Sequence, residues 1–71
     1  MEDTVRAFAK NHGYDSVRKS IKWSGYNVYE PFCYGDDNFF GYSIYILASN
    51  GNVRLTTRQE AQVLNRLIRH F

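Results

Sequence analysis

The side chains that could perform catalysis in this chain are few, and they do not form a recognisable catalytic set. Asp36 and Asp37 are adjacent in a glycine-containing loop, so their carboxylates are expected to diverge, and the sequence places no second acid against them across a substrate. The segment Asp36-Asp37-Asn38 also lacks the alternating ligands and the distant glutamate of a calcium loop. We interpret this loop as a solvated turn, and catalysis by its acids is the alternative.

The histidines, serines, glycines and the cysteine give no stronger indication of catalysis or metal binding. His12 and His70 are expected at helix ends and have no cysteine or acid at ligand spacing. The serines have no glycine elbow, and the glycines are scattered singly, so no phosphate-cradling loop is predicted. Cys33 is the only cysteine, which excludes an intrachain disulfide and leaves a cysteine zinc site short of ligands. We interpret it as a small buried hydrophobe, with a reactive thiol as the alternative. The prediction is a protein that is not an enzyme and that holds no metal or cofactor.

Tyrosine, asparagine and basic residues in the strand-forming part of the chain are instead typical of a binding surface. Tyrosine and arginine dominate binding hot spots, because a rigid ring buries area while its hydroxyl finds a partner. In the register derived below, these residues fall on a sheet face that no helix covers: Arg18, Lys22, Asn27, Tyr29, Tyr45 and Arg54. A second candidate surface is the outer face of a C-terminal helix, with Arg58, Arg66 and Arg69. The alternative for the sheet face is an ordinary solvated surface, where β-propensity alone favours tyrosine.

The elements that would position these residues are organised around the stretch from Phe39 to Leu55. Aromatic and β-branched residues crowd its first half, and Asn50-Gly51 supplies the two residues with positive φ that a type I′ hairpin turn requires. Two further strands are predicted before it, over Val17–Trp23 and Tyr26–Cys33, joined by a tight turn at Ser24-Gly25.

The three predicted connections define a register for the sheet. A two-residue turn at Ser24-Gly25 places Lys19 opposite Glu30, and a loop closed over residues 34–38 brings the third strand beside the second. With the turn at Asn50-Gly51, the whole register keeps one apolar face, which a slip of one residue would invert. That face carries Trp23, Val28, Ile44, Ile46 and Leu55.

A helix is predicted at each end of the chain. Asp3 is the expected N-cap of the first helix, and Gly13 ends it. Thr57 and Glu60 match a capping box before the second helix. Its apolar residues are Ala61, Val63, Leu64, Leu67, Ile68 and Phe71. The predicted fold is therefore a single α+β domain over residues 1–71: a four-stranded antiparallel meander with both helices packed on one face.

Composition and charge constrain the cellular setting and the partner. The 71 residues carry a net charge of +2, and 17% are aromatic, which is one way for a small domain to gain a core without disulfides. The charges are segregated, with +3 over Ser16–Gly25, −3 over Tyr26–Ser49 and +3 over Arg54–Phe71. No apolar run is long enough to span a bilayer, and the acidic start is unlike a signal peptide. We expect a soluble, unprocessed cytoplasmic protein.

In outline the order helix, antiparallel sheet, helix resembles the double-stranded-RNA-binding domain across nearly the whole chain. That family places a lysine-rich cluster at the start of its second helix, where residues 56–60 here supply one cation and one acid. Its strand loop with Gly-Pro has no counterpart, because Pro31 is the only proline and lies inside a predicted strand. No RNA contacts are therefore carried over from the family.

These observations favour a small interaction or regulatory protein that acts by occupying a surface of a protein partner. In size and in its lack of motifs the chain resembles the accessory and inhibitor proteins that phages and mobile elements encode. The alternative is a nucleic-acid-binding module that stacks bases on Tyr29 and Tyr45 while nearby cations neutralise phosphates. A homodimer paired through an edge strand, Val53–Leu55 or Val17–Trp23, is a related hypothesis.

Overall fold

The computed structural model describes residues 2–35 and 44–69, with the side chain of Arg69 excepted. Its elements follow the predicted order of helix, four strands and helix. They are α1 (Glu2–Asn11), β1 (Ser16–Trp23), β2 (Tyr26–Phe32), β3 (Ile46–Ser49), β4 (Asn52–Leu55) and α2 (Arg58–Arg69). This order confirms the α+β class.

The four strands form one open antiparallel sheet in the order β1-β2-β3-β4, so each strand pairs with the next along the chain. Both predicted tight turns are confirmed, because all four of their central residues have positive φ. Ser24 and Gly25 have φ of 53° and 83°, and Asn50 and Gly51 have φ of 49° and 86°. This is the geometry of a type I′ turn, whose twist matches that of the strands it joins.

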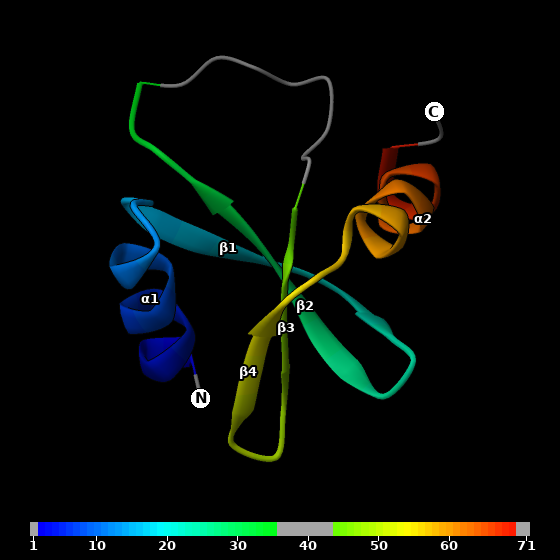
Figure 1. Ribbon diagram of the computed structural model, residues 1–71, viewed down its shortest axis with the longest axis horizontal. Helices are drawn as coiled ribbons and strands as arrows, with labels where there is room; N and C mark the ends of the chain where they lie inside the picture. Colours follow the sequence, from blue (N-terminus) through cyan, green and yellow to red (C-terminus); the bar gives the residue numbers. More distant parts are fainter. Residues whose placement is uncertain (1, 36–43, 70–71) are drawn as a thin grey trace.

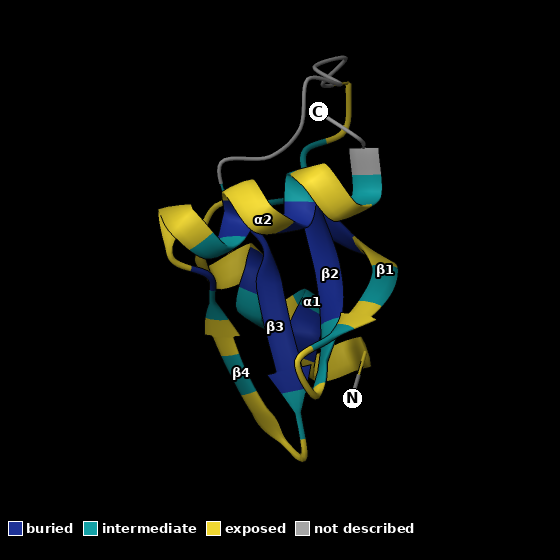
Figure 2. Ribbon diagram, turned by 90° about the vertical axis from the view of Figure 1, so that its right-hand side faces the viewer, coloured by how far each residue is buried: buried dark blue, intermediate teal, exposed yellow. Residues whose placement is uncertain are grey.

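The helices cover opposite faces of the sheet, and the prediction that both pack on one face is wrong. Val5 and Ala9 of α1 pack with Tyr29 and Ile46, whereas α2 packs against the face that carries Val28 and Leu47. Successive strand residues point to opposite faces, so these neighbours in sequence belong to different cores. Figure 1 shows α1 and α2 on either side of the twisted sheet, and Figure 2 shows α2 in front of β2 and β3 with α1 behind.

One reason for the difference is a β-bulge in β1. Near the turn Lys22 lies opposite Asn27, as predicted, but Lys19 lies opposite Tyr29, so two residues of β1 face one residue of β2. The extra residue shifts the first half of β1 by one position and thereby moves it to the other face. Arg18, and not Lys19, therefore lies opposite Glu30.

The second reason is the connection between β2 and β3. Val28 pairs with Leu47, three positions beyond its predicted partner Ile44, and an odd shift inverts the faces. The loop does not close over residues 34–38, because β2 ends at Phe32 and β3 begins at Ile46. Residues 39–43 of the predicted third strand and residues 36–38 of the predicted loop lie outside the described residues. The register of β3 with β4, with Ile46 opposite Leu55, is confirmed.

The inner strand β3 is buried on both sides as a consequence. Tyr45, Ile46, Leu47 and Ala48 are all fully buried, with alternate side chains in the two cores. A continuous apolar run of this kind is typical of a strand covered on both faces. A half-open sheet would show an alternation of apolar and polar residues instead.

The start of α1 differs slightly from the prediction, whereas its end agrees. The helix already includes Glu2, so Asp3 is not the N-cap; it lies in the first turn, with its carboxylate 3.5 Å from the guanidinium of Arg6. Gly13, with φ of 90°, follows the helix as expected. Within the described residues, neither helix has the length and apolarity needed to cross a lipid bilayer.

Cys33 and His12 lie near this end of α1. Cys33 is half-buried, and its thiol contacts the carbonyl oxygen of Gly13 at 3.7 Å. His12 is exposed, and its Nδ1 donates to the carbonyl oxygen of Phe8 at 2.9 Å. Its predicted partner for a metal site, His70, lies outside the described residues, as does the acidic loop of Asp36 and Asp37.

Candidate binding surface

Two residues of the predicted open sheet face are buried. Tyr29 is 3% exposed in the core beneath α1, and Tyr45 is fully buried in the core beneath α2. The hydroxyl of Tyr45 donates to Oδ1 of Asn65 on α2, so its polar end is satisfied inside the protein. Neither ring is available for stacking on a partner.

The other four residues of that predicted face do not form one patch. Arg18 donates to the buried carboxylate of Glu30 at 3.0 Å, at the end of β1 that is far from the turn. Lys22 and Asn27 lie opposite each other beside the β1–β2 turn. Arg54 is on β4, where it contacts the first turn of α2. The structure thus brings Lys22 and Asn27 together and separates the rest.

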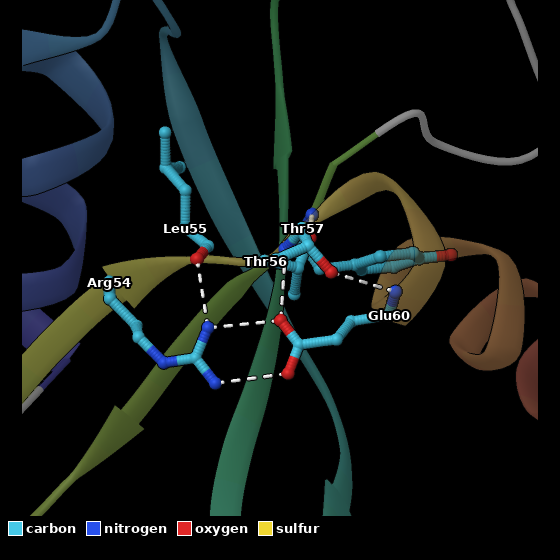
Figure 3. Close-up of polar contacts among 6 residues, drawn as sticks. Arg54, Leu55, Thr56, Thr57 and Glu60 are labelled. Atoms are coloured by element: carbon cyan, nitrogen blue, oxygen red, sulfur yellow. Dashed lines mark hydrogen bonds and ion pairs between the residues drawn. The ribbon is translucent and has the colours of Figure 1, made fainter.

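Arg54 joins the sheet to α2 through a two-pronged ion pair with Glu60. Its Nη1 and Nη2 lie 3.0 and 3.1 Å from Oε1 and Oε2 of Glu60, as Figure 3 shows. Nη1 also donates to the carbonyl oxygen of Leu55 at 3.1 Å, and the guanidinium lies 5.1 Å from the ring centroid of Tyr26. A paired carboxylate and an aromatic face together hold the arginine in one orientation.

The capping box that the sequence predicts is confirmed at the same place. Oγ1 of Thr57 accepts from the amide of Glu60 at 3.1 Å, and the amide of Thr57 donates to Oε1 of Glu60 at 2.9 Å (Figure 3). Each residue thereby satisfies an amide that the helix itself leaves without a partner. Glu60 therefore serves two elements, because the same carboxylate caps α2 and binds Arg54.

These contacts shift the ionisation of both partners. The Arg54 guanidinium, followed by the Thr57 amide, lowers the pKa of Glu60 to about 2 from its usual value of about 4.5. The hydrogen bonds from the Arg54 side chain to Glu60 likewise raise the pKa of Arg54 further above its usual range. Both groups stay charged throughout the physiological range, so the junction persists.

A second junction links the strand ends beside α2. The amide of Tyr45 donates to Oγ1 of Thr56 at 2.9 Å, and the amide of Thr56 donates back to the carbonyl oxygen of Tyr45 at 2.9 Å. Thr56 is buried, so this pair is protected from water. The start of α2 is therefore fixed against both β3 and β4, and the orientation of the helix is set by the sheet.

The side of α2 that faces away from the sheet is partly apolar. Ala61, Leu64 and Ile68 pack into the core, whereas Val63 and Leu67 point outward with 45% and 51% of their surface exposed. They lie one helical turn apart and therefore next to each other. We define the outer face of α2 as the exposed residues of this helix: Arg58, Gln59, Gln62, Val63, Arg66 and Leu67. Figure 2 shows this exposed side toward the viewer.

The sequence pattern counts Val63 and Leu67 among the apolar residues of the helix and does not indicate that they are exposed. The signal that could have found them is the width of the apolar arc. A helix packed on one sheet buries a single stripe, which Ala61, Leu64 and Ile68 fill at spacings of three and four. Val63 and Leu67 lie outside that buried stripe, so their apolar side chains remain exposed.

The outer face of α2 is also positively charged. Arg58 and Arg66 are exposed and form no ion pair with any described residue, while the one acid of the helix, Glu60, is neutralised by Arg54. Both arginines belong to the second surface that the sequence predicts. The third, Arg69, is the last residue of α2.

Among the residues that the structure describes, no three histidine, cysteine or acidic side chains come close enough together to hold a metal ion. Comparisons of the chain with protein families, with curated proteins and with solved structures found no match.

Proposed function

We propose that this protein is a non-enzymatic interaction module that binds a partner protein through the outer face of α2. The observation that carries this proposal is the exposure of Val63 and Leu67, one turn apart on a helix whose opposite side fills the core. Binding is itself the function: the module regulates its partner by occupying a surface, as accessory and inhibitor proteins of phages and mobile elements do.

The apolar pair supplies the driving force. Full burial of a valine or leucine side chain contributes about 1.5–3 kcal/mol, so covering two half-exposed side chains contributes about 2 kcal/mol in total. That corresponds to roughly a thirtyfold gain in affinity. Gln59 and Gln62 at the margin can satisfy polar groups of the partner, which is the usual composition of an interface rim.

The charges indicate the chemistry of the partner. Arg58 and Arg66 flank the apolar pair along the helix, and the face carries no acid. A complementary surface is therefore apolar at its centre and acidic at its rim, because matched charges speed association and exclude other partners. The first partner to expect is an acidic protein surface.

The junctions at the start of α2 support this role. A helix fixed by the Arg54–Glu60 pair and by the capping box is already in its binding orientation. Such pre-organisation reduces the ordering cost that association must overcome. Because Cys33 is the only cysteine and is unpaired, we place this interaction in a reducing compartment such as the cytoplasm.

The test is affinity capture from the native host with the wild type and the double variant Val63→Ser, Leu67→Ser. Both substitutions lie on the exposed side of α2, so the fold, checked by circular dichroism, is expected to be retained. We expect a specific protein in the wild-type capture whose affinity falls about tenfold or more in the double variant. Arg58→Glu with Arg66→Glu should weaken the same interaction, with a salt dependence that the wild type shows and this variant loses.

The matched control is Ala7→Ser with Asn11→Ser on the exposed side of α1, which should capture the same protein as the wild type. Equal capture by all variants would place the contact elsewhere and reject the outer face of α2. A solution mass of twice the monomer that reverts in the α2 variant would identify a second copy as the occupant. Dimerisation that survives the α2 variant would instead favour pairing through β1 or β4, which are the two edges of the sheet.

A further inference from the structure

The helix α2 covers only part of the sheet face on which it packs. Val28 and Leu47 are fully buried in the core beneath α2, whereas Trp23 and Tyr26 pack at the margin of the same core and are half-buried. Figure 2 shows α2 crossing the strands near the end away from the turns, with both hairpins extending below it. Among the described residues, no helix lies over this lower part of the face, because α1 packs on the opposite side.

One row of side chains crosses the sheet at this level, next to the two turns. Trp23 and Tyr26 are cross-strand partners, and so are Ser49 and Asn52. Tyr26 and Ser49 border the same hollow between the hairpins. Ser49 lies two residues from Leu47 and therefore points to the α2 side of the sheet, as does its partner Asn52. We define these residues as the hairpin-end row: Trp23, Tyr26, Ser49 and Asn52.

The exposed apolar residues of α2 lie on the side of the helix that borders this row. Glu60, Val63 and Leu67 are separated by three and four positions, so they line one side of α2. At the start of that side Glu60 binds Arg54, whose guanidinium lies 5.1 Å from the ring centroid of Tyr26. Figure 1 shows α2 and the β1–β2 turn on the same side of the sheet. The apolar side of α2 and the hairpin-end row therefore border one continuous surface.

The uncovered part of this face has the width of one helix. Tyr26 lies two residues from Val28 toward the turn, which is about 7 Å at the rise of a β-strand. Packed helices lie about 8–10 Å apart, so a helix beside α2 would lie over the hairpin-end row. Four strands spaced about 4.8 Å apart are crossed by about three turns of helix. The surface therefore fits an α-helix of about 11 residues.

We propose that the partner presents an amphipathic, acidic α-helix that lies beside α2 on the hairpin-end row. Its apolar stripe covers Leu67, Trp23 and Tyr26, and its acidic residues lie near the exposed Arg66, one turn after Val63. A second copy of this chain fits less well, because its α2 would bring three arginines and a single acid that is already paired. This inference rests on the function proposed above, because Val63 and Leu67 belong to both contacts.

The probe is a synthetic peptide of about 14 residues, with leucine at the i, i+3, i+4 and i+7 positions and glutamate elsewhere. Trp23 is the only tryptophan of the chain and belongs to the row, so its fluorescence reports contact at the sheet. We expect a saturable shift of the emission to shorter wavelength, with a gain of peptide helicity in circular dichroism. A peptide of the same composition with alternating leucines should give neither, and a lysine version should bind at least about tenfold more weakly.

Asn52 allows a matched test of the row without disturbing a core, because it is exposed. Asn52→Glu should weaken binding of the glutamate peptide about threefold or more, and Asn52→Lys should strengthen it. Asn11→Glu and Asn11→Lys make the same charge changes on the exposed side of α1 and should leave binding unchanged. Circular dichroism should confirm that each variant is folded.

Amide chemical shifts of the isotope-labelled protein separate this inference from the proposed function. Changes at both Leu67 and Trp23 would support both. Changes confined to α2 would retain the outer face of α2 as the partner site and overturn the helix on the hairpin-end row. Binding at Trp23 that is unchanged in Val63→Ser, Leu67→Ser would reject the α2 contact that both proposals share. No saturable response, or an equal response to the peptide with alternating leucines, would overturn this inference, whereas the capture experiment tests the α2 site by itself.

Discussion

The ion pair between Arg54 of β4 and Glu60 of α2 gives Arg54 a structural role in place of the partner-binding role that the sequence predicts. Arg54 was predicted to meet a partner from an open face, yet both terminal nitrogens of its guanidinium bind the carboxylate of Glu60. The sequence identifies Glu60 as the second residue of a capping box, from local spacing alone. The contact of Glu60 with Arg54 of β4 depends on how α2 packs on the sheet. This packing is a tertiary property, and the residues near Glu60 in the sequence do not predict it.

The ionisation of Glu60 predicts an acid-dependent loss of stability. Its pKa is lowered to about 2 in the folded protein, against a usual value of about 4.5, so folding favours the charged form. This contribution to the free energy of unfolding is complete above about pH 4.5 and is lost as the pH falls toward 2. We expect the urea midpoint of the wild type to fall more between about pH 5.5 and 3 than that of Glu60→Gln. The side chain of Glu60 is 25% exposed and that of Arg54 45%, so screening keeps the difference small.

The matched control for this measurement is Glu2→Gln. Glu2 forms an exposed pair with Arg6 on α1, in which both side chains are 40% or more exposed. A pair of this kind contributes little to stability, so this variant should follow the wild-type pH profile. Parallel profiles for the wild type and Glu60→Gln would mean that the carboxylate of Glu60 is not held by Arg54 in solution.

At the scale of elements, the sequence correctly predicted which helices and strands form and their order along the chain. It did not predict the register of the strands or the sheet face that each helix covers. Both two-residue turns, the capping box and the end of α1 at Gly13 follow from short-range residue chemistry, and the structure confirms them. The bulge in β1 and the register of β3 against β2 are properties of the pairing between strands, for which short-range residue chemistry gives no signal. Each departs from the predicted pairing by an odd number of residues, and each therefore inverts a face.

The same register shifts explain why the residues of the predicted open sheet face do not form one surface. With the register inverted, Tyr29 and Tyr45 move from an open face into the two cores, while Lys22 and Asn27 keep their predicted pairing because they lie between the turn and the bulge. Pairing close to a well-defined turn was thus predictable. Burial of a tyrosine depended on where the helices dock, and amphipathic periodicity does not say which sheet face a helix covers.

The bulge itself gives a prediction at this scale. Deletion of Ser20 leaves one residue of β1 opposite Val28, so Arg18 should stay opposite Glu30 and Lys22 opposite Asn27 in a regular ladder. We expect a folded protein whose urea midpoint is close to that of the wild type, and nuclear Overhauser contacts between Arg18 and Glu30 should persist. Insertion of a second serine after Ser20 is the control. It adds another unpaired residue to the ladder and should lower stability. Equal damage from deletion and insertion would show that the bulge is needed by the fold.

At the scale of the whole molecule, the sheet separates two small cores. The core under α1 contains Ala9 and Ile46, and the core under α2 contains Ala61 and Leu47. In a domain of 71 residues, covering both faces is a way to bury more of a short sheet than one layer of helices allows. This arrangement leaves no face of β3 free, and it is consistent with our proposal that the partner binds the outer face of α2.

The two-sided arrangement predicts that the cores are energetically independent. Ala9 and Ala61 are matched probes, because each is a buried helical alanine, one in each core. Ala9→Gly and Ala61→Gly should each cost about 1–2 kcal/mol, from helix propensity and the lost methyl group. Residues on opposite faces share no side-chain partners, so the double variant should lose the sum of the two costs within about 0.5 kcal/mol in urea unfolding. Helices packed side by side on one face, as the sequence pattern predicted, would instead place the two sites in one core and produce a coupling energy of about 1 kcal/mol or more.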